Sequence, residues 1–374
     1  MRSRHFPAFF LALIFILTGC NSTKQVAPAP ALRTYNGTAS VGDFLTISLN
    51  STAQTISYSD VSNSTTGTVP YTVNSDGSYT LADPNGNLLS AYEVPNYALL
   101  IEAAKTGPNS NSPALITAVE SGPISLATFE GQAYNYMQFR TSQGGVDIGS
   151  VSISSQGLAT TSSYWPYGAV NAGDSGMSPF NGSTMDFSQA KLDSSGTFLY
   201  MPDIGNSAVN DYAFGTANGM FIVDTPNGAI LGLKKAASKD FDPSFAGNYK
   251  GLSFQKTNVT WTPGVGESGT TTQDGGSVVV SSTGQVTILD SNGNQIAQST
   301  LTPVADASYL YDGTAATLQD PCFGLFTFRI TTATSQQDIF ISFLGNAVVF
   351  SEFGADLPWG NGGTYSYAYG VAIK

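Results

Sequence analysis

The chain has 374 residues, enough for two or three domains of ordinary size, each with its own hydrophobic core. Charged residues make up 11%, against about 25% in an average soluble protein, and the formal net charge is −12. No basic run exceeds Lys234-Lys235, so we expect no nucleic-acid partner.

The first twenty residues have the order of an export signal. Two arginines precede an unbroken apolar run from Ala8 to Leu17, which is too short for a spanning helix. The run ends in Leu17-Thr18-Gly19-Cys20, which resembles the lipobox of bacterial lipoproteins. The resemblance implies a signal peptide over residues 1–19 and acylation of Cys20. It also implies that a lipid on Cys20 attaches the mature protein to a membrane of the bacterial cell envelope.

Removal of the signal peptide would limit the catalytic and metal-binding groups of the mature protein. The only histidine, His5, leaves with it, so the mature chain has no imidazole. Ser-His-Asp and Cys-His nucleophile systems and His-ligated metals are thereby excluded, which argues against an enzyme. If Cys20 carries the lipid that the resemblance implies, Cys322 has no intramolecular partner, and no disulfide framework is expected. We expect no metal and no cofactor.

Residues 20–33 predict a tether. They alternate alanine with proline and lack apolar periodicity, as semi-extended linkers do. Asn21 follows the acylated cysteine, and in lipoproteins of the enterobacterial type a residue other than aspartate there implies sorting to the outer membrane.

From Thr34 onward the pattern predicts antiparallel strands. Short runs rich in Val, Ile, Tyr, Phe and Thr lie between clusters of Gly, Asn, Asp and Ser, and 40 glycines supply the turns. The best helix candidate is the stretch from Ser90 to Lys105, which Pro95 interrupts. The C-terminal run from Tyr365 to Ile373 alternates in polarity and predicts a strand with one apolar face.

Recurring features suggest diverged modules of about 100 residues. An aromatic residue, any residue and a glycine precede a strand at Tyr35, Phe129 and Phe245. Each module is expected to close with a pair of strands: 98–101 with 114–119, 220–223 with 229–233, and 339–343 with 347–350. We therefore predict an all-β fold of two or three antiparallel sandwich or barrel-like modules, over residues 34–125, 126–240 and 241–374.

One local resemblance suggests an alternative. The stretches Asp193–Asp203 and Ala208–Phe214 resemble one blade of a lactonase-type β-propeller. That family repeats the pattern about every 45 residues, and one good copy is present here. A propeller is the alternative fold.

Candidate ligand-binding residues are aromatic. Trp165 lies beside Pro166 in a polar stretch with Tyr164 and Tyr167, and Trp359 precedes a tyrosine run that begins at Tyr365. A flat ring with polar neighbours suits the apolar face and the hydroxyl groups of a sugar. The alternative interpretation is that these rings cap the ends of the modules.

Three classes of function remain open. The leading one is a non-catalytic binding or surface-interaction protein with a polysaccharide or envelope partner. The second is a glycan- or lactone-active enzyme that uses carboxylates. The isolated residues Glu93, Glu130 and Glu352 are candidates for it, although no pattern selects a pair. The third is a structural component of the envelope.

Overall fold

The computed structural model describes residues 29–82, 88–103, 114–140, 145–167, 184–203, 207–262, 266–307, 320, 322–356 and 364–374. The chain from Ala31 to Lys374 forms one compact unit. Its described helices are single 3₁₀ turns: η1 (Leu126–Thr128), η2 (Phe187–Gln189), η3 (Pro243–Phe245) and η4 (Val304–Asp306). None of the helices in these ranges has the length and apolar content needed to cross a bilayer. The expected all-β class is confirmed.

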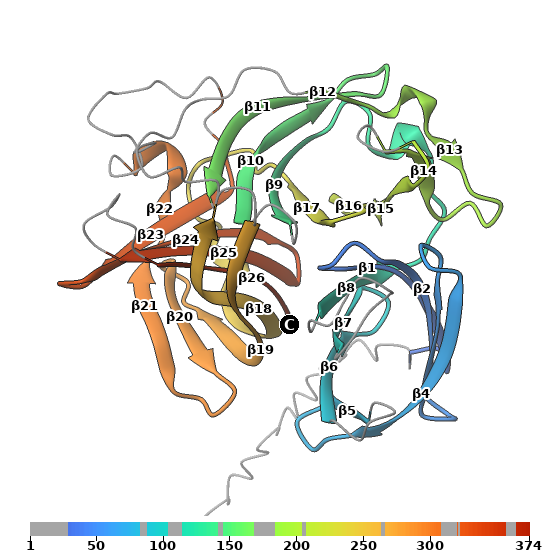
Figure 1. The fold of residues 1–374 in the computed structure, drawn as a ribbon, viewed down its shortest axis with the longest axis horizontal. Helices are drawn as coiled ribbons and strands as arrows, with labels where there is room; N and C mark the ends of the chain where they lie inside the picture. The colour runs from blue at the N-terminus through green and yellow to red at the C-terminus, as the bar shows by residue number, and fades with distance from the viewer. Residues whose placement is uncertain are drawn as a thin grey trace, which may run out of the picture. The chain divides into compact units, whose positions relative to one another are not determined.

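The first eight strands form a closed barrel, because β1 pairs with both β2 and β8 (Figure 1). They are β1 (Leu32–Ala39), β2 (Phe44–Asn50), β3 (Thr55–Asp60), β4 (Thr65–Val73), β5 (Tyr79–Ala82), β6 (Leu88–Val94), β7 (Ala98–Ala103) and β8 (Ala114–Glu120). Closure removes the sheet edges and encloses a core that includes Tyr35, Ile47 and Leu99. Because β1 begins at Leu32, the last two residues of the predicted tether lie in a strand.

The second sheet has nine strands in the order β12-β11-β10-β9-β17-β16-β15-β14-β13. They are β9 (Ala133–Arg140), β10 (Gly145–Ile153), β11 (Leu158–Tyr167), β12 (Thr184–Asp186), β13 (Lys191–Leu192), β14 (Leu199–Pro202), β15 (Asn210–Thr216), β16 (Met220–Thr225) and β17 (Gly228–Lys234). The first strand, β9, pairs with the last, β17, at the centre of the sheet.

The third sheet repeats this arrangement with the order β21-β20-β19-β18-β26-β25-β24-β23-β22. Its strands are β18 (Gly247–Thr262), β19 (Gly266–Val280), β20 (Gln285–Asp290), β21 (Gln295–Thr300), β22 (Thr302–Pro303), β23 (Leu325–Thr331), β24 (Ser335–Leu344), β25 (Ala347–Asp356) and β26 (Tyr365–Ile373). Again the first strand pairs with the last, since Leu252 lies opposite Val371.

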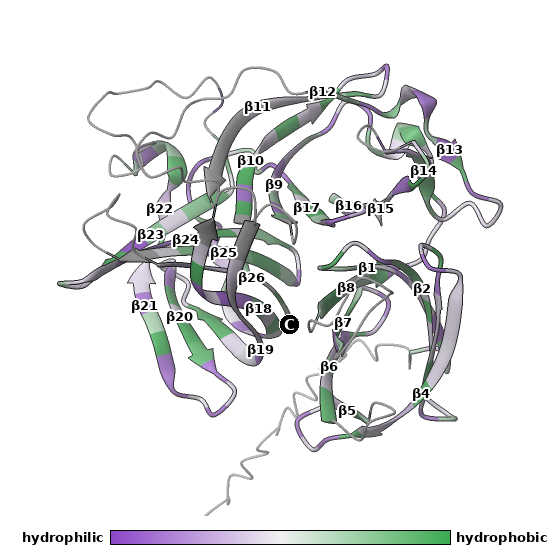
Figure 2. Cartoon of the chain, in the orientation of Figure 1, coloured by the Kyte–Doolittle hydropathy of each residue, from purple (hydrophilic) through white to green (hydrophobic). Residues whose placement is uncertain are grey.

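A shared hydrophobic core joins the sheets. Phe44 of the barrel stacks on Tyr212 of the second sheet, with ring centroids 4.6 Å apart. Phe139 of the second sheet meets Phe254 of the third edge-on at 4.7 Å. Hydrophobic residues are accordingly spread over strands of all three sheets rather than gathered in one element (Figure 2).

The three closing strand pairs are confirmed as β7 with β8, β16 with β17, and β24 with β25. The helix candidate is wrong: it folds as β6 and β7, joined by a turn in which Asn96 has a φ of 59°.

The predicted C-terminal strand exists, but both faces of its second half are buried because it lies at the centre of the sheet. The described strands do not form a propeller, since a blade holds four strands. The division into three domains stays a prediction.

Candidate functional site

A cavity of about 420 Å³ opens on one face of the third sheet. Its lining includes Ser253 and Gln255 of β18, Asp274 of β19, Gln337 of β24 and Glu352 of β25. We call this site the third-sheet cavity. Its volume is within the range of small-molecule sites in proteins, about 300–1,000 Å³.

Strand register explains why these polar side chains share one face. Ser253 pairs with Asp274, and Ala368 lies opposite both Gln255 and Glu352. Paired residues, and residues two apart on one strand, point to the same side of a sheet. The same face carries the apolar cluster of Tyr249, Ile341 and Val348, so the cavity continues a hydrophobic core.

Small residues make room for the cavity. Gly370 lies opposite Phe350, and a Cβ atom at Gly370 would overlap the Phe350 ring. The glycine therefore lets this ring lie against β26. Ala368 and Ala372 of the same strand also line the cavity and fill little of it.

The cavity is acidic. Burial raises the pKa of Glu352. Asp274 is an exposed residue at the mouth of the cavity, and its partial desolvation, followed by the charge of Asp290, raises its pKa. Hydrogen bonds from Asn294 and Asn292 lower the pKa of Asp290. Among the described residues that line the cavity, none is a lysine, an arginine or a histidine. In the described part of the chain, no group donates a hydrogen bond to the Glu352 or the Asp274 carboxyl.

A second acidic region lies where the barrel meets the second sheet. Asp224 of β16 is 1% exposed and accepts a hydrogen bond from the Thr38 hydroxyl of β1. Burial, with the charges of Asp43, Asp211 and Asp60 further raising it, holds the pKa of Asp224 well above its usual range. A smaller cavity of about 260 Å³ lies nearby, lined by Asp43, Asn63 and Tyr212.

Glu93, one of the three glutamates singled out in the sequence, is fully engaged inside the barrel. Its carboxylate accepts hydrogen bonds from Arg33 Nε at 2.6 Å and Nη2 at 2.8 Å, and from the hydroxyls of Tyr35 and Tyr79, each at 2.5 Å. These four donors occupy its oxygens, so Glu93 holds the barrel interior together. Glu130 lies in the turn between η1 and β9.

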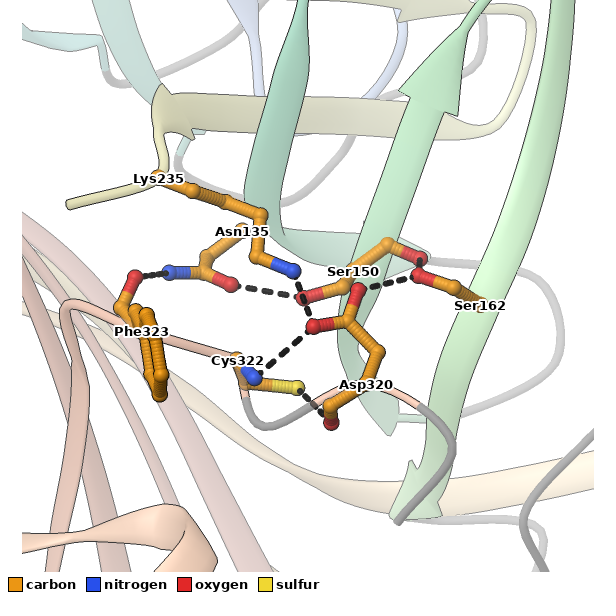
Figure 3. Close-up of polar contacts among 7 residues, drawn as sticks. All are labelled: Asn135, Ser150, Ser162, Lys235, Asp320, Cys322 and Phe323. Carbon is orange, nitrogen blue, oxygen red and sulfur yellow. Dashed lines mark hydrogen bonds and ion pairs between the residues drawn. The ribbon is translucent and has the colours of Figure 1, made fainter. Parts of the chain in front are cut away.

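Polar contacts also fasten the second sheet to the third (Figure 3). The Asp320 carboxylate forms an ion pair with the Lys235 ammonium and accepts a hydrogen bond from the Ser162 hydroxyl at 2.5 Å. The Asn135 amide donates to the Phe323 carbonyl at 2.9 Å. Cys322 is completely buried beside them, and its thiol donates to the Asp320 carbonyl at 3.4 Å. Cys322 is thus a free thiol packed inside the fold.

Three of the predicted aromatic residues lie in a strand: Tyr164, Trp165 and Tyr167 belong to β11. Pro166 is tolerated there because β12 pairs only with the beginning of β11, among the described strands, which leaves an edge. Tyr365 lies in β26, stacked near Phe353 at 6.1 Å. Trp359 and Cys20 are outside the described residues. The aromatic ligand surface and the lipid on Cys20 remain predictions.

The sequence singled out Glu352 as one of three isolated glutamates, but it gave no indication of the other polar residues in the third-sheet cavity. Asp274 lies in a Gly-rich stretch that looks like a turn, yet it belongs to the long strand β19. Its spacing from Glu352 along the chain carries no signal, because only the pairing of β18 with β26 brings β19 and β25 into one sheet. Within the described residues, no group of three or more acidic, histidine or cysteine side chains could hold a metal ion.

No protein-family model and no curated protein matches the chain. Two mutants of the vaccine antigen Transferrin Binding Protein B from Haemophilus parasuis Hp5 are each 10% identical to it, with TM-scores of 0.22 and 0.20. The matches cover 88% and 92% of this chain but 66% and 76% of theirs, so the chain spans just under two thirds of the first. A Nostoc punctiforme protein with unknown function, from the DUF3598 family, is 6% identical, with a TM-score of 0.16 over 92% of this chain and 96% of that one. Likenesses this weak carry no argument about fold or function.

Proposed function

We propose that this protein is a non-catalytic binding protein of the bacterial cell envelope that holds a small polar ligand in the third-sheet cavity. The main support for this proposal is the cavity itself, which is about 420 Å³ in volume and is lined by amide, hydroxyl and carboxyl groups beside the Phe350 ring. Convergent polar groups around an apolar surface are the usual composition of a ligand site. A rigid sheet holds them in place without a ligand.

A panel of small polar molecules tests this function. Neutral saccharides, polyols, amines and amino acids should be compared for the rise in Tm they produce, because a ligand stabilises the folded state that it binds. At least one class should raise the Tm. The variant Ala368→Leu fills the cavity and should lose the effect. A panel without any response, or a response that survives in Ala368→Leu, would count against the proposal.

Attachment to the envelope through Cys20 is the second part of the proposal. It rests on the lipobox resemblance of Leu17-Thr18-Gly19-Cys20. Cys20→Ala should move the mature protein from the membrane fraction to the soluble fraction, since a lipid chain supplies the membrane affinity. Retention of the processed variant after a salt wash would show a different mode of attachment. Density-gradient separation of the two membranes tests the outer-membrane location.

One observation favours a second candidate, an enzyme acting on glycans or lactones. Glu352 lines the cavity, and burial raises its pKa, as in an acid catalyst. Chromogenic glycosides and lactones should then be hydrolysed, and Glu352→Gln should abolish the turnover. Binding without turnover, in the wild type as in the variant, would leave the non-catalytic proposal standing.

A further inference from the structure

Acidic groups line the third-sheet cavity at two separate places. Asp274 and Asp290 come from the neighbouring strands β19 and β20, and Glu352 comes from β25. The sheet order places β18 and β26 between β19 and β25. Three strand spacings along the sheet therefore separate the two acidic places, on the order of 14 Å when measured along its curve.

The strip between the acidic places is uncharged. Ser253 and Gln255 of β18 and Ala368 of β26 line it, with the Phe350 ring beside them. An extended molecule lying across these strands would meet a carboxylate at each end and uncharged groups in the middle.

We propose that the third-sheet cavity binds a small organic cation with an amine at each end, a diamine or polyamine. This inference rests on the proposed binding function and names the ligand class of the same site. Ammonium groups would pair with Glu352 at one end and with Asp274 and Asp290 at the other. The methylenes between them would lie over the uncharged strip.

Charge favours this class over the alternatives. An anion would find no cationic side chain among the described lining residues, and it would meet up to three carboxylates. A metal ion lacks a converging set of three ligands in the same part of the chain. A neutral sugar would satisfy the hydrogen-bonding groups and leave the carboxyls without a counter-charge. The chain's net charge of −12 also steers cations toward it.

Isothermal titration calorimetry on the mature chain at low ionic strength tests the inference. The probes are 1,5-diaminopentane and spermidine, with 1,5-pentanediol as the uncharged match. Both amines should bind, and the diol should not. Glu352→Gln and Asp274→Asn should each weaken amine binding at least tenfold. Glu120→Gln removes the same charge from an exposed position outside the cavity and should leave binding unchanged.

Three outcomes would overturn the inference. Amine affinity that is the same in the wild type, Glu352→Gln and Asp274→Asn would indicate non-specific attraction. A neutral saccharide that binds and is lost in Ala368→Leu, while the amines fail, would refute the amine class and keep the binding function. If no probe bound, both the amine inference and the proposed binding function would be refuted. Loss of folding is not expected in Glu352→Gln, because the carboxyl has no described partner to lose; circular dichroism melting checks this.

Discussion

At the scale of single residues, hydrogen-bond partners separate the glutamates that the sequence left equivalent. Glu93 and Glu352 both follow short apolar runs, and nothing local distinguishes them. Glu93 meets Arg33, 60 residues earlier in the chain, only because the barrel closes. Glu352 lines a cavity without such a partner. Position in the sequence identifies isolated acids, but the fold decides which of them is structural.

The Glu93 cluster gives a residue-scale prediction. Glu93→Gln would leave the Arg33 guanidinium, in a residue that is 7% exposed, without its counter-charge. We expect the free energy of unfolding to fall by about 3–5 kcal/mol, the cost of breaking a buried ion pair. Tyr79→Phe removes one hydrogen bond to the same carboxylate and should cost about 1.5–3 kcal/mol. Urea unfolding measures both, and equal losses would mean that charge is not the cause.

At the scale of elements, local pairing was predictable and long-range pairing was not. Hairpins such as β16 with β17 follow from turn residues and alternation within about fifteen positions. The pairing of β18 with β26 joins residues more than a hundred positions apart, and no pattern encodes it. The cavity depends on that pairing, so its position could not be predicted either. The strand position of Trp165 could not be predicted either, because a proline beside aromatic residues fits a loop as well as an edge strand.

The β1–β2 turn supplies an element-scale prediction. Gly42 has a φ of 94°, and a Cβ atom there would overlap the Thr225 carbonyl oxygen of the second sheet. Gly42→Ala therefore adds a steric clash to the backbone penalty. Gly77 has a similar φ of 85° with open space around it, so Gly77→Ala carries the backbone penalty alone, about 1–2 kcal/mol.

We expect Gly42→Ala to cost roughly 1–3 kcal/mol more than Gly77→Ala, the usual range for overpacking. Thermal and urea unfolding of the pair provide the comparison. Matching losses in the two variants would show that the turn can move away from Thr225 without cost.

At the scale of the whole molecule, two sets of carboxyls with shifted pKa values respond to pH in opposite directions. The Lys250 ammonium lowers the pKa of Asp76, so this pair stabilises the fold above about pH 4 and is lost as the pH falls. Burial, followed by the charge of Asp203, raises the pKa of Asp211 to about 7. Burial also raises the pKa of Asp224. Between the unfolded and the folded pKa values, Asp211 and Asp224 are protonated in the folded state and ionised in the unfolded state. The free energy of unfolding therefore falls as the pH rises through this range.

The raised pKa values predict that the protein is more stable near pH 4.5 than near pH 7.5. Asp211 is 4% exposed, and its Oδ1 atom has no hydrogen-bond partner among the described residues. At about 1.4 kcal/mol per pH unit, its ionisation should cost roughly 3 kcal/mol between pH 4.5 and its folded pKa of about 7. Urea unfolding at the two pH values measures the difference. Asp211→Asn should shrink it, whereas Asp240→Asn, which removes the same charge from an exposed position, should leave it in place. A pH dependence that is identical in both variants would place its origin in net charge rather than in the buried carboxyl.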